Sequence, residues 1–159
     1  MSDSSDIQTE VIRQAEKKAL RLLTVSDRTE HQLREKLREG GFPPEAVDAA
    51  VEYVRSFHYV DDRRYAESFI RFRKEEKSIY EIRMELKKRG VPDDLIEETM
   101  NASDFDEEAV VMHLFEKKYG LKDLTDPKLY ERAFRYFGSR GFTYESIRSG
   151  ITKAVGEDV

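Results

Sequence analysis

One segment of this chain occurs twice, 49 residues apart, and a weaker third copy follows it. Residues 29–43 align with residues 78–92, and both copies open on a hydroxyl residue and end on a glycine, an apolar residue and a proline. The third copy keeps four of these positions, shifted by 51 residues: Ala133, Phe137, Gly141 and Phe142. A fixed period of this length indicates a repeat architecture, in which one small unit is stacked several times. Such proteins usually work through a long surface and not through an enclosed active site.

Composition agrees with thin layers of helices and excludes several classes of protein. Hydrophobic and charged residues each make up 38% of the 159 residues, which is little apolar material for one thick core. The sequence has no cysteine, so disulfides and thiolate metal sites are excluded. No apolar run approaches the roughly 20 residues of a membrane span, and the polar start of the chain is unlike a signal peptide. We therefore expect a cytoplasmic protein that does not associate with a membrane.

The local signals predict three helices in each repeat. Thr29 and Gln32 have the spacing of a capping box, in which a hydroxyl and an amide side chain bind free N–H groups at a helix start. Ser78 and Glu81 repeat this pair, and Gly90 ends the helix that they begin, because glycine adopts the left-handed conformation without a Cβ clash. The sequence therefore predicts an all-α fold of three tandem three-helix repeats, stacked into an elongated, curved array.

The helix starts also predict where the repeats begin and end. Asp61 or Asp62 is expected to cap the first helix of the second repeat, and Asp104 and Glu107 precede the first helix of the third. The predicted repeats cover residues 11–60, 61–105 and 106–155. We expect a disordered acidic tail at residues 1–10 and a short tail at residues 156–159.

The sequence has no residues at a spacing that would form a catalytic or metal-binding site. His31, His58 and His113 belong to three different helical units, and no His pair has the spacing of a metal site. Asp61 and Asp62 could form a catalytic carboxylate pair, but helix capping explains them at lower cost. The chain has no phosphate-binding loop and no nucleophile elbow. We expect no catalytic, cofactor-binding or metal-binding residues, no cofactor, and no enzymatic activity.

Charge is distributed unevenly along the chain, although its net value is only −5. Residues 93–108 hold eight acids and no Lys or Arg, whereas residues 11–92 hold 19 basic and 15 acidic side chains. Helical spacing places several cations of the middle repeat side by side, although some of them could pair with acids of their own helix. These residues form the predicted partner-binding or DNA-binding surface: Arg63, Arg64, Arg71, Arg73, Lys74, Arg83 and Lys87.

Several short motifs, taken in their order and spacing, resemble the RecX family of recombinase regulators. The longest runs from Val60 to Arg73 and contains Asp-Asp-Arg-Arg-Tyr-Ala followed by Phe-Ile. The others are Ala19-Leu20-Arg21-Leu22-Leu23, Glu30-x-x-Leu33-x-x-Lys36-Leu37, Ile82-Arg83-x-Glu85-Leu86-x-x-Arg89-Gly90-Val91, Lys118-Tyr119-Gly120 and Arg140-Gly141-Phe142. The quoted motifs lie between residues 19 and 142, and the resemblance covers about residues 15–155, nearly the whole chain.

This resemblance implies a regulatory protein that binds the RecA recombinase as a filament on DNA. It further implies inhibition of the ATPase, strand-exchange and co-protease activities of RecA, and so a role in recombination and SOS repair. We expect a monomer, with at most weak binding to single- or double-stranded DNA. Two other functions stay open: a helical nucleic-acid-binding protein that acts on DNA directly, and a general helical adaptor.

Overall fold

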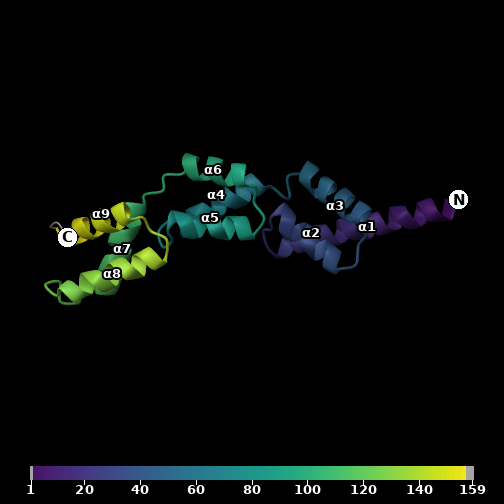
Figure 1. Cartoon of the computed structure of the whole chain (residues 1–159). Coiled ribbons are helices and arrows are strands. Elements are labelled where there is room, and N and C mark those ends of the chain that lie inside the picture. Colours follow the sequence, from purple (N-terminus) through teal and green to yellow (C-terminus); the bar gives the residue numbers. More distant parts are fainter. Residues whose placement is uncertain (1, 157–159) are drawn as a thin grey trace. The chain divides into compact units, whose positions relative to one another are not determined.

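The structure of the protein is a computed structural model that describes residues 2–156 (Figure 1). These residues contain nine α-helices and no strand. The helices are α1 (Ser2–Val25), α2 (Glu30–Glu39), α3 (Pro44–Ser56), α4 (Asp62–Arg73), α5 (Ile79–Lys88), α6 (Asp93–Ala102), α7 (Glu107–Tyr119), α8 (Pro127–Ser139) and α9 (Tyr144–Val155). The prediction of an all-α chain built from three-helix repeats is confirmed. None of the described helices combines the length and the apolar character that crossing a bilayer requires.

The described helices belong to two compact units, which we describe one at a time. The first unit comprises the residues up to Glu67 together with Leu86–Thr99. The second comprises Ser68–Glu85 together with the residues from Met100 onward. The division passes through α4, α5 and α6, so the middle repeat contributes residues to both units.

In the first unit, α3 packs against both α1 and α2. The apolar residues of α2 recur every four positions, so Leu33 and Leu37 lie on one face and are fully buried. Burial of one such side chain stabilises the fold by about 1.5–3 kcal/mol. The buried residues of this core are Ala15, Ala19, Leu33, Leu37, Ala46, Val47, Ala50, Val51, Val54 and Val60.

In the second unit, α9 packs against both α7 and α8. Aromatic rings carry much of this core, and the rings of Phe137 and Phe142 meet edge to face with their centroids 5.5 Å apart. Its buried residues are Val110, Val111, Phe115, Tyr119, Leu129, Ala133, Phe137, Phe142, Ile147 and Ile151.

Side-chain caps begin the helices largely as the sequence predicts. The Gln32 amide N–H donates to Thr29 Oγ1 at 3.1 Å, and the Thr29 amide donates to Gln32 Oε1 at 3.1 Å, so the capping box of α2 is confirmed. Ser78 and Glu81 form the corresponding box at α5, with distances of 3.0 Å. Of the two candidate caps for α4, Asp61 performs this role, because its Oδ1 accepts the Arg64 amide N–H at 3.1 Å.

The N-terminal segment differs from its prediction as a disordered tail. Residues 2–10 continue α1, which begins at Ser2. No proline or glycine interrupts residues 2–25, and Asp3 lies in the first turn, where a carboxylate interacts favourably with the helix dipole. Residues 3–10 are exposed throughout. Met1 and residues 157–159 lie outside the described residues, and Gly156 ends α9 with a φ of 78°.

Candidate partner-binding surface and inter-repeat joints

The predicted binding surface consists of seven cations of the middle repeat, and the structure divides them between the two units. The first unit contains three of them, Arg63, Arg64 and Lys87. The second unit contains the other four, Arg71, Arg73, Lys74 and Arg83. The geometry of each group is therefore given separately.

In the first unit, two of the three cations bind groups of the chain itself. Arg63 forms an ion pair with Glu98 of α6, and this carboxylate raises the pKa of the Arg63 guanidinium. Arg64 Nη1 donates to the backbone carbonyl of His58 at 2.9 Å, in the turn that precedes α4. Lys87 is exposed in the last turn of α5. Arg63 and Arg64 therefore hold α4 to its neighbours, whereas Lys87 faces solvent.

In the second unit, Lys74 and Arg83 lie close to carboxylates. The Lys74 ammonium lies 2.7 Å from Asp104 Oδ1, and only 29% of the Lys74 side chain is exposed. This hydrogen bond lowers the pKa of Asp104. Arg83 is exposed on α5, and its charge partly opposes the effect of burial, which raises the pKa of Glu107. Both cations thus interact with carboxylates of the second unit.

The side chains of the two other arginines of the second unit contact residues of their own helix. Arg71 Nη2 donates to Ser68 Oγ at 3.1 Å, and its guanidinium lies 5.9 Å from the ring centroid of Phe72. The guanidinium of Arg73 lies 5.5 Å from the ring of Phe69. Because Arg71 and Lys87 are exposed and neither forms an ion pair with another described residue, they are the strongest candidates for contact with a partner.

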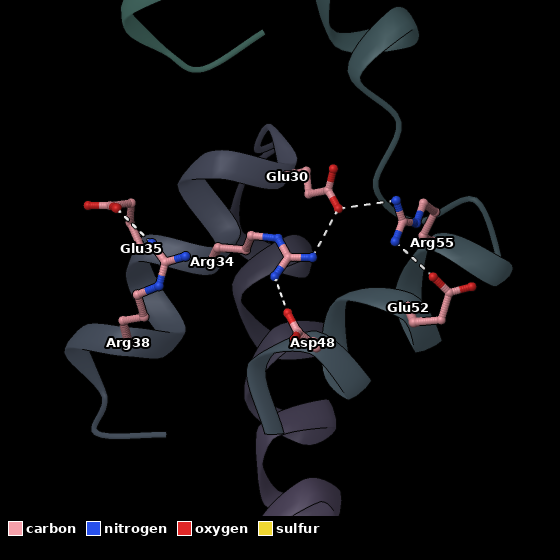
Figure 2. Close-up of polar contacts among 7 residues, drawn as sticks. All are labelled: Glu30, Arg34, Glu35, Arg38, Asp48, Glu52 and Arg55. Carbon is pink, nitrogen blue, oxygen red and sulfur yellow. Dashed lines mark hydrogen bonds and ion pairs between the residues drawn. The ribbon is translucent and has the colours of Figure 1, made fainter. Parts of the chain in front are cut away.

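Several arginines of the first repeat form ion pairs with carboxylates of the same repeat, as Figure 2 shows. Arg34 lies between Asp48 at 2.6 Å and Glu30 at 3.4 Å, and the hydrogen bond to Asp48 raises the pKa of Arg34. Arg55 connects Glu30 at 3.2 Å with Glu52 at 2.8 Å. Paired charges of this kind attract phosphate weakly, so this network is unlike a DNA-binding stripe.

Two similar sets of hydrogen bonds, which we call the inter-repeat joints, connect successive repeats, and no signal within a single repeat predicts them. Thr29 Oγ1 donates to the carbonyl of Arg89 at 2.6 Å, so the start of α2 meets the end of α5. Ser78 Oγ donates to the carbonyl of Arg140 at 2.7 Å, so the start of α5 meets the end of α8. Each hydroxyl also accepts the capping N–H of its own helix, which uses both its donor and its acceptor capacity.

A carboxylate from the following repeat completes each joint. Asp62 Oδ1 accepts the amide N–H of Glu30, the first residue of α2, at 2.9 Å. Glu107 bonds the amide of Ile79, the first residue of α5, and its Oε1 also accepts the Thr143 N–H at 3.1 Å. Burial raises the pKa of both carboxyl groups. The first N–H groups of α2 and α5, which have no partner within their own helix, thus bond a carboxylate of the following repeat.

The residues that form the two joints occupy equivalent positions of the sequence repeats. Thr29 and Ser78 are both hydroxyl residues at the same place in their repeats, and an Arg-Gly pair ends the second helix at Arg89 and again at Arg140. Nothing in a single repeat shows that these two features touch. The contact becomes apparent only when consecutive repeats are packed.

We predict that Ser78→Ala destabilises the protein more than Thr143→Ala does. Both residues cap helices, and loss of a cap costs about 0.5–2 kcal/mol. Ser78 is fully buried and its removal also leaves the Arg140 carbonyl without this hydrogen bond, which adds about 1–3 kcal/mol. Urea denaturation of both variants measures the difference. Equal losses would show that the Ser78 hydroxyl serves its own helix alone.

The described residues offer no metal centre. Residues 2–156 contain no group of three or more His, Cys, Asp or Glu side chains that could hold a metal ion. A hollow of about 360 Å³ in the second unit is lined by residues of mixed charge, among them Lys74, Asp104 and His113. The Lys74–Asp104 ion pair uses two of the charged groups of its wall, which also include Glu75 and Asp106.

Comparison with family models identifies all three repeats. Models described as the first, second and third three-helix domains of RecX match residues 15–53, 61–100 and 106–151, respectively. The order of the domains is the same as in the models.

Curated relatives agree with this result. A regulatory protein RecX from Trichlorobacter lovleyi is 35% identical over 141 residues, which cover 85% of this chain and 92% of the relative. A regulatory protein RecX from Clostridium perfringens is 31% identical over 139 residues, covering 85% of this chain and 66% of the relative. The chain thus spans slightly less than two thirds of that relative. These relatives are named as regulatory proteins and not as enzymes, in line with the prediction of a protein without enzymatic activity.

Solved structures share the fold. A crystal structure of RecX from Lactobacillus salivarius superposes with a TM-score of 0.77 at 18% identity, covering 92% of this chain and 98% of the other. A crystal structure of a second regulatory protein RecX gives a TM-score of 0.75 at 20% identity, covering 90% of this chain and 74% of the other. With three family domains matched in order and a relative that is 35% identical over most of both chains, the protein belongs to the RecX family.

Proposed function

We propose that this protein binds the RecA recombinase as a filament on DNA and inhibits its ATPase, strand-exchange and co-protease activities. The observation that carries the proposal is the match of all three RecX domains, in order, over residues 15–151. The protein would act as a monomer in the cytoplasm, without a cofactor, and would modulate recombination and SOS repair. The repeat limits at residues 11–60, 61–105 and 106–155 are part of the same proposal.

The contact surface that we propose lies on the basic residues of the middle repeat. Arg71 and Lys87 are its first members, because both are exposed and neither is paired with a carboxylate of residues 2–156. Arg63 and Lys74 are weaker candidates, because they pair with Glu98 and Asp104. Cations of this kind would meet an acidic surface of the filament and would speed its encounter with the protein.

Co-sedimentation with RecA–DNA filaments, combined with RecA ATPase rates, tests the proposal directly. We expect the full chain to pellet with the filament and to lower ATP hydrolysis in proportion to the amount bound. A chain that pellets with naked single-stranded DNA as strongly as with the filament would support direct action on DNA. A chain that binds neither would support a general adaptor.

We predict that Arg71→Glu combined with Lys87→Glu slows association with the filament by about tenfold at low salt. The difference should shrink as salt rises, because exposed charges are screened within about 10 Å at 0.1 M. Thermal stability should be nearly unchanged, since exposed helical charges contribute only a few tenths of a kcal/mol. Association rates at two salt concentrations provide the measurement.

The matched control changes the same net charge on α8. Lys128→Glu combined with Arg135→Glu alters two exposed cations outside the proposed surface. This control should associate at close to the wild-type rate. If both double variants slow association equally, net charge alone explains the effect and the contact surface lies elsewhere.

A further inference from the structure

We propose that three exposed aromatic side chains of the first repeat, Tyr53, Phe57 and Tyr59, form a docking anchor for a protein partner. We call these three residues the aromatic ladder. The partner would offer an apolar pocket bordered by a carboxylate. The inference rests on the proposed function for the identity of that partner, the RecA filament, and adds a contact surface outside the basic residues of the middle repeat.

The rings of the aromatic ladder contact one another while staying accessible to solvent. Tyr53 and Phe57 lie one turn apart on α3 and just beyond it, and their rings meet edge to face with centroids 5.2 Å apart. Phe57 and Tyr59 stack at 5.7 Å with an interplanar angle of 22°. Their exposed fractions are 37%, 54% and 52%. The core does not require them, because Val54 on the same helix already fills the buried position.

Backbone hydrogen bonds at the end of α3 hold the aromatic ladder in place and impose an unfavourable conformation on His58. The amide of Tyr59 donates to the Val54 carbonyl and the amide of His58 donates to the Arg55 carbonyl, both at 2.9 Å, which closes the end of α3. This closure puts His58 at a φ of 59°, and it is the only described residue other than glycine with a positive φ. Arg64 fixes the turn through its bond to the His58 carbonyl. Residues held in uncommon backbone conformations, as His58 is, cluster at functional sites. Rings that are already held in one position also lose little conformational entropy when they bind.

Charge beside the ladder indicates the chemistry of the partner. Tyr59 also lines a small hollow together with Arg28, Arg64, Asp27, Asp61 and Tyr65. Within the described residues, Arg28 Nε is buried and has no hydrogen-bond partner, so this guanidinium is not fully satisfied by the chain itself. Tyr, Phe and Arg are the residues enriched at the centres of protein interfaces.

The same hollow disfavours nucleic acid as the occupant. Single-stranded DNA would also stack on aromatic rings, but it carries a phosphate at every nucleotide. Asp27 and Asp61 line the hollow, and Glu52 and Glu30 pair with Arg55 on the preceding turn. This mixed charge suits one carboxylate of a protein partner better than a continuous polyanion.

Binding of the full chain to immobilised RecA–DNA filaments tests the ladder. Phe57→Ala and Tyr59→Ala should each weaken affinity by about tenfold or more, mainly through faster dissociation. Tyr59→Phe keeps the ring and should bind within about twofold of wild type. Tyr144→Ala removes a 70% exposed aromatic side chain from α9 and serves as the control, with affinity again near wild type. Thermal melts should be unchanged, because all the altered rings are exposed.

Three results would overturn the proposal in distinguishable ways. Wild-type affinity in both Phe57→Ala and Tyr59→Ala contradicts the ladder and leaves the proposed function intact. An equal loss of affinity for a labelled oligonucleotide without RecA shows that the rings bind nucleic acid and not protein. A wild-type chain that does not bind the filament contradicts the proposed function, and with it the partner assigned to the ladder.

Discussion

Replacing Gly90 by alanine should lower the free energy of unfolding by about 3 kcal/mol, whereas Gly41→Ala should lower it by only about 1 kcal/mol. Both glycines end a second helix of a repeat with a φ of 86°, where a side chain is strained. They differ in what surrounds them. A Cβ on Gly90 would lie 2.2 Å from the Cβ of His31, but a Cβ on Gly41 would meet nothing within 4 Å. The difference between the two losses in stability measures how closely the first and second repeats pack at Gly90.

Gly141 provides a second test of the same joint. A Cβ there would lie 2.6 Å from the Tyr80 ring, so Gly141→Ala should behave like Gly90→Ala. Urea denaturation of the three alanine variants gives the comparison. In the background of His31→Gly, which removes the His31 Cβ, Gly90→Ala should cost less stability than it does in the wild type, because the two sites contact each other. Equal losses at Gly41, Gly90 and Gly141 would show that only the left-handed backbone matters and that the repeats do not press on these glycines.

Leu86→Ala should lower the free energy of unfolding by about 2–5 kcal/mol, because it removes a fully buried side chain and leaves a cavity. Met84 lies two residues earlier on α5 and is 49% exposed. Met84→Ala should therefore change stability by less than about 0.5 kcal/mol. The same urea titration serves both variants. Similar losses in the two would mean that α5 does not bury the face assigned to it.

The starts and ends of the helices were predictable because they depend on residues close together in the chain. Thr29 with Gln32 and Ser78 with Glu81 are pairs three residues apart, and each forms the capping box expected from its spacing. The buried positions of α2 and α8 follow from helical periodicity in the same way. Residues 2–10, for which the sequence predicts a disordered tail, belong to α1 in the structure, because they are polar but contain no proline or glycine to interrupt the helix.

The candidate site was only partly predictable, because exposure and pairing depend on distant residues. Lys74 has the helical spacing of a surface cation, but Asp104, 30 residues later, pairs with it. Asp62 looked like a cap for its own helix, yet it bonds the start of α2, 32 residues earlier. Arg140 pairs with Glu81 across 59 residues.

By itself, then, the sequence determined the helices, their caps, their buried faces and the repeat period, since each of these arises from interactions within about four residues. Tertiary structure alone decided which cations stay exposed, which carboxylates are buried, and how Thr29 and Ser78 connect one repeat to the next. Those features require donors and acceptors from different helices to meet at hydrogen-bonding distance. Such a meeting depends on how the helices pack, and no pattern within one repeat encodes it.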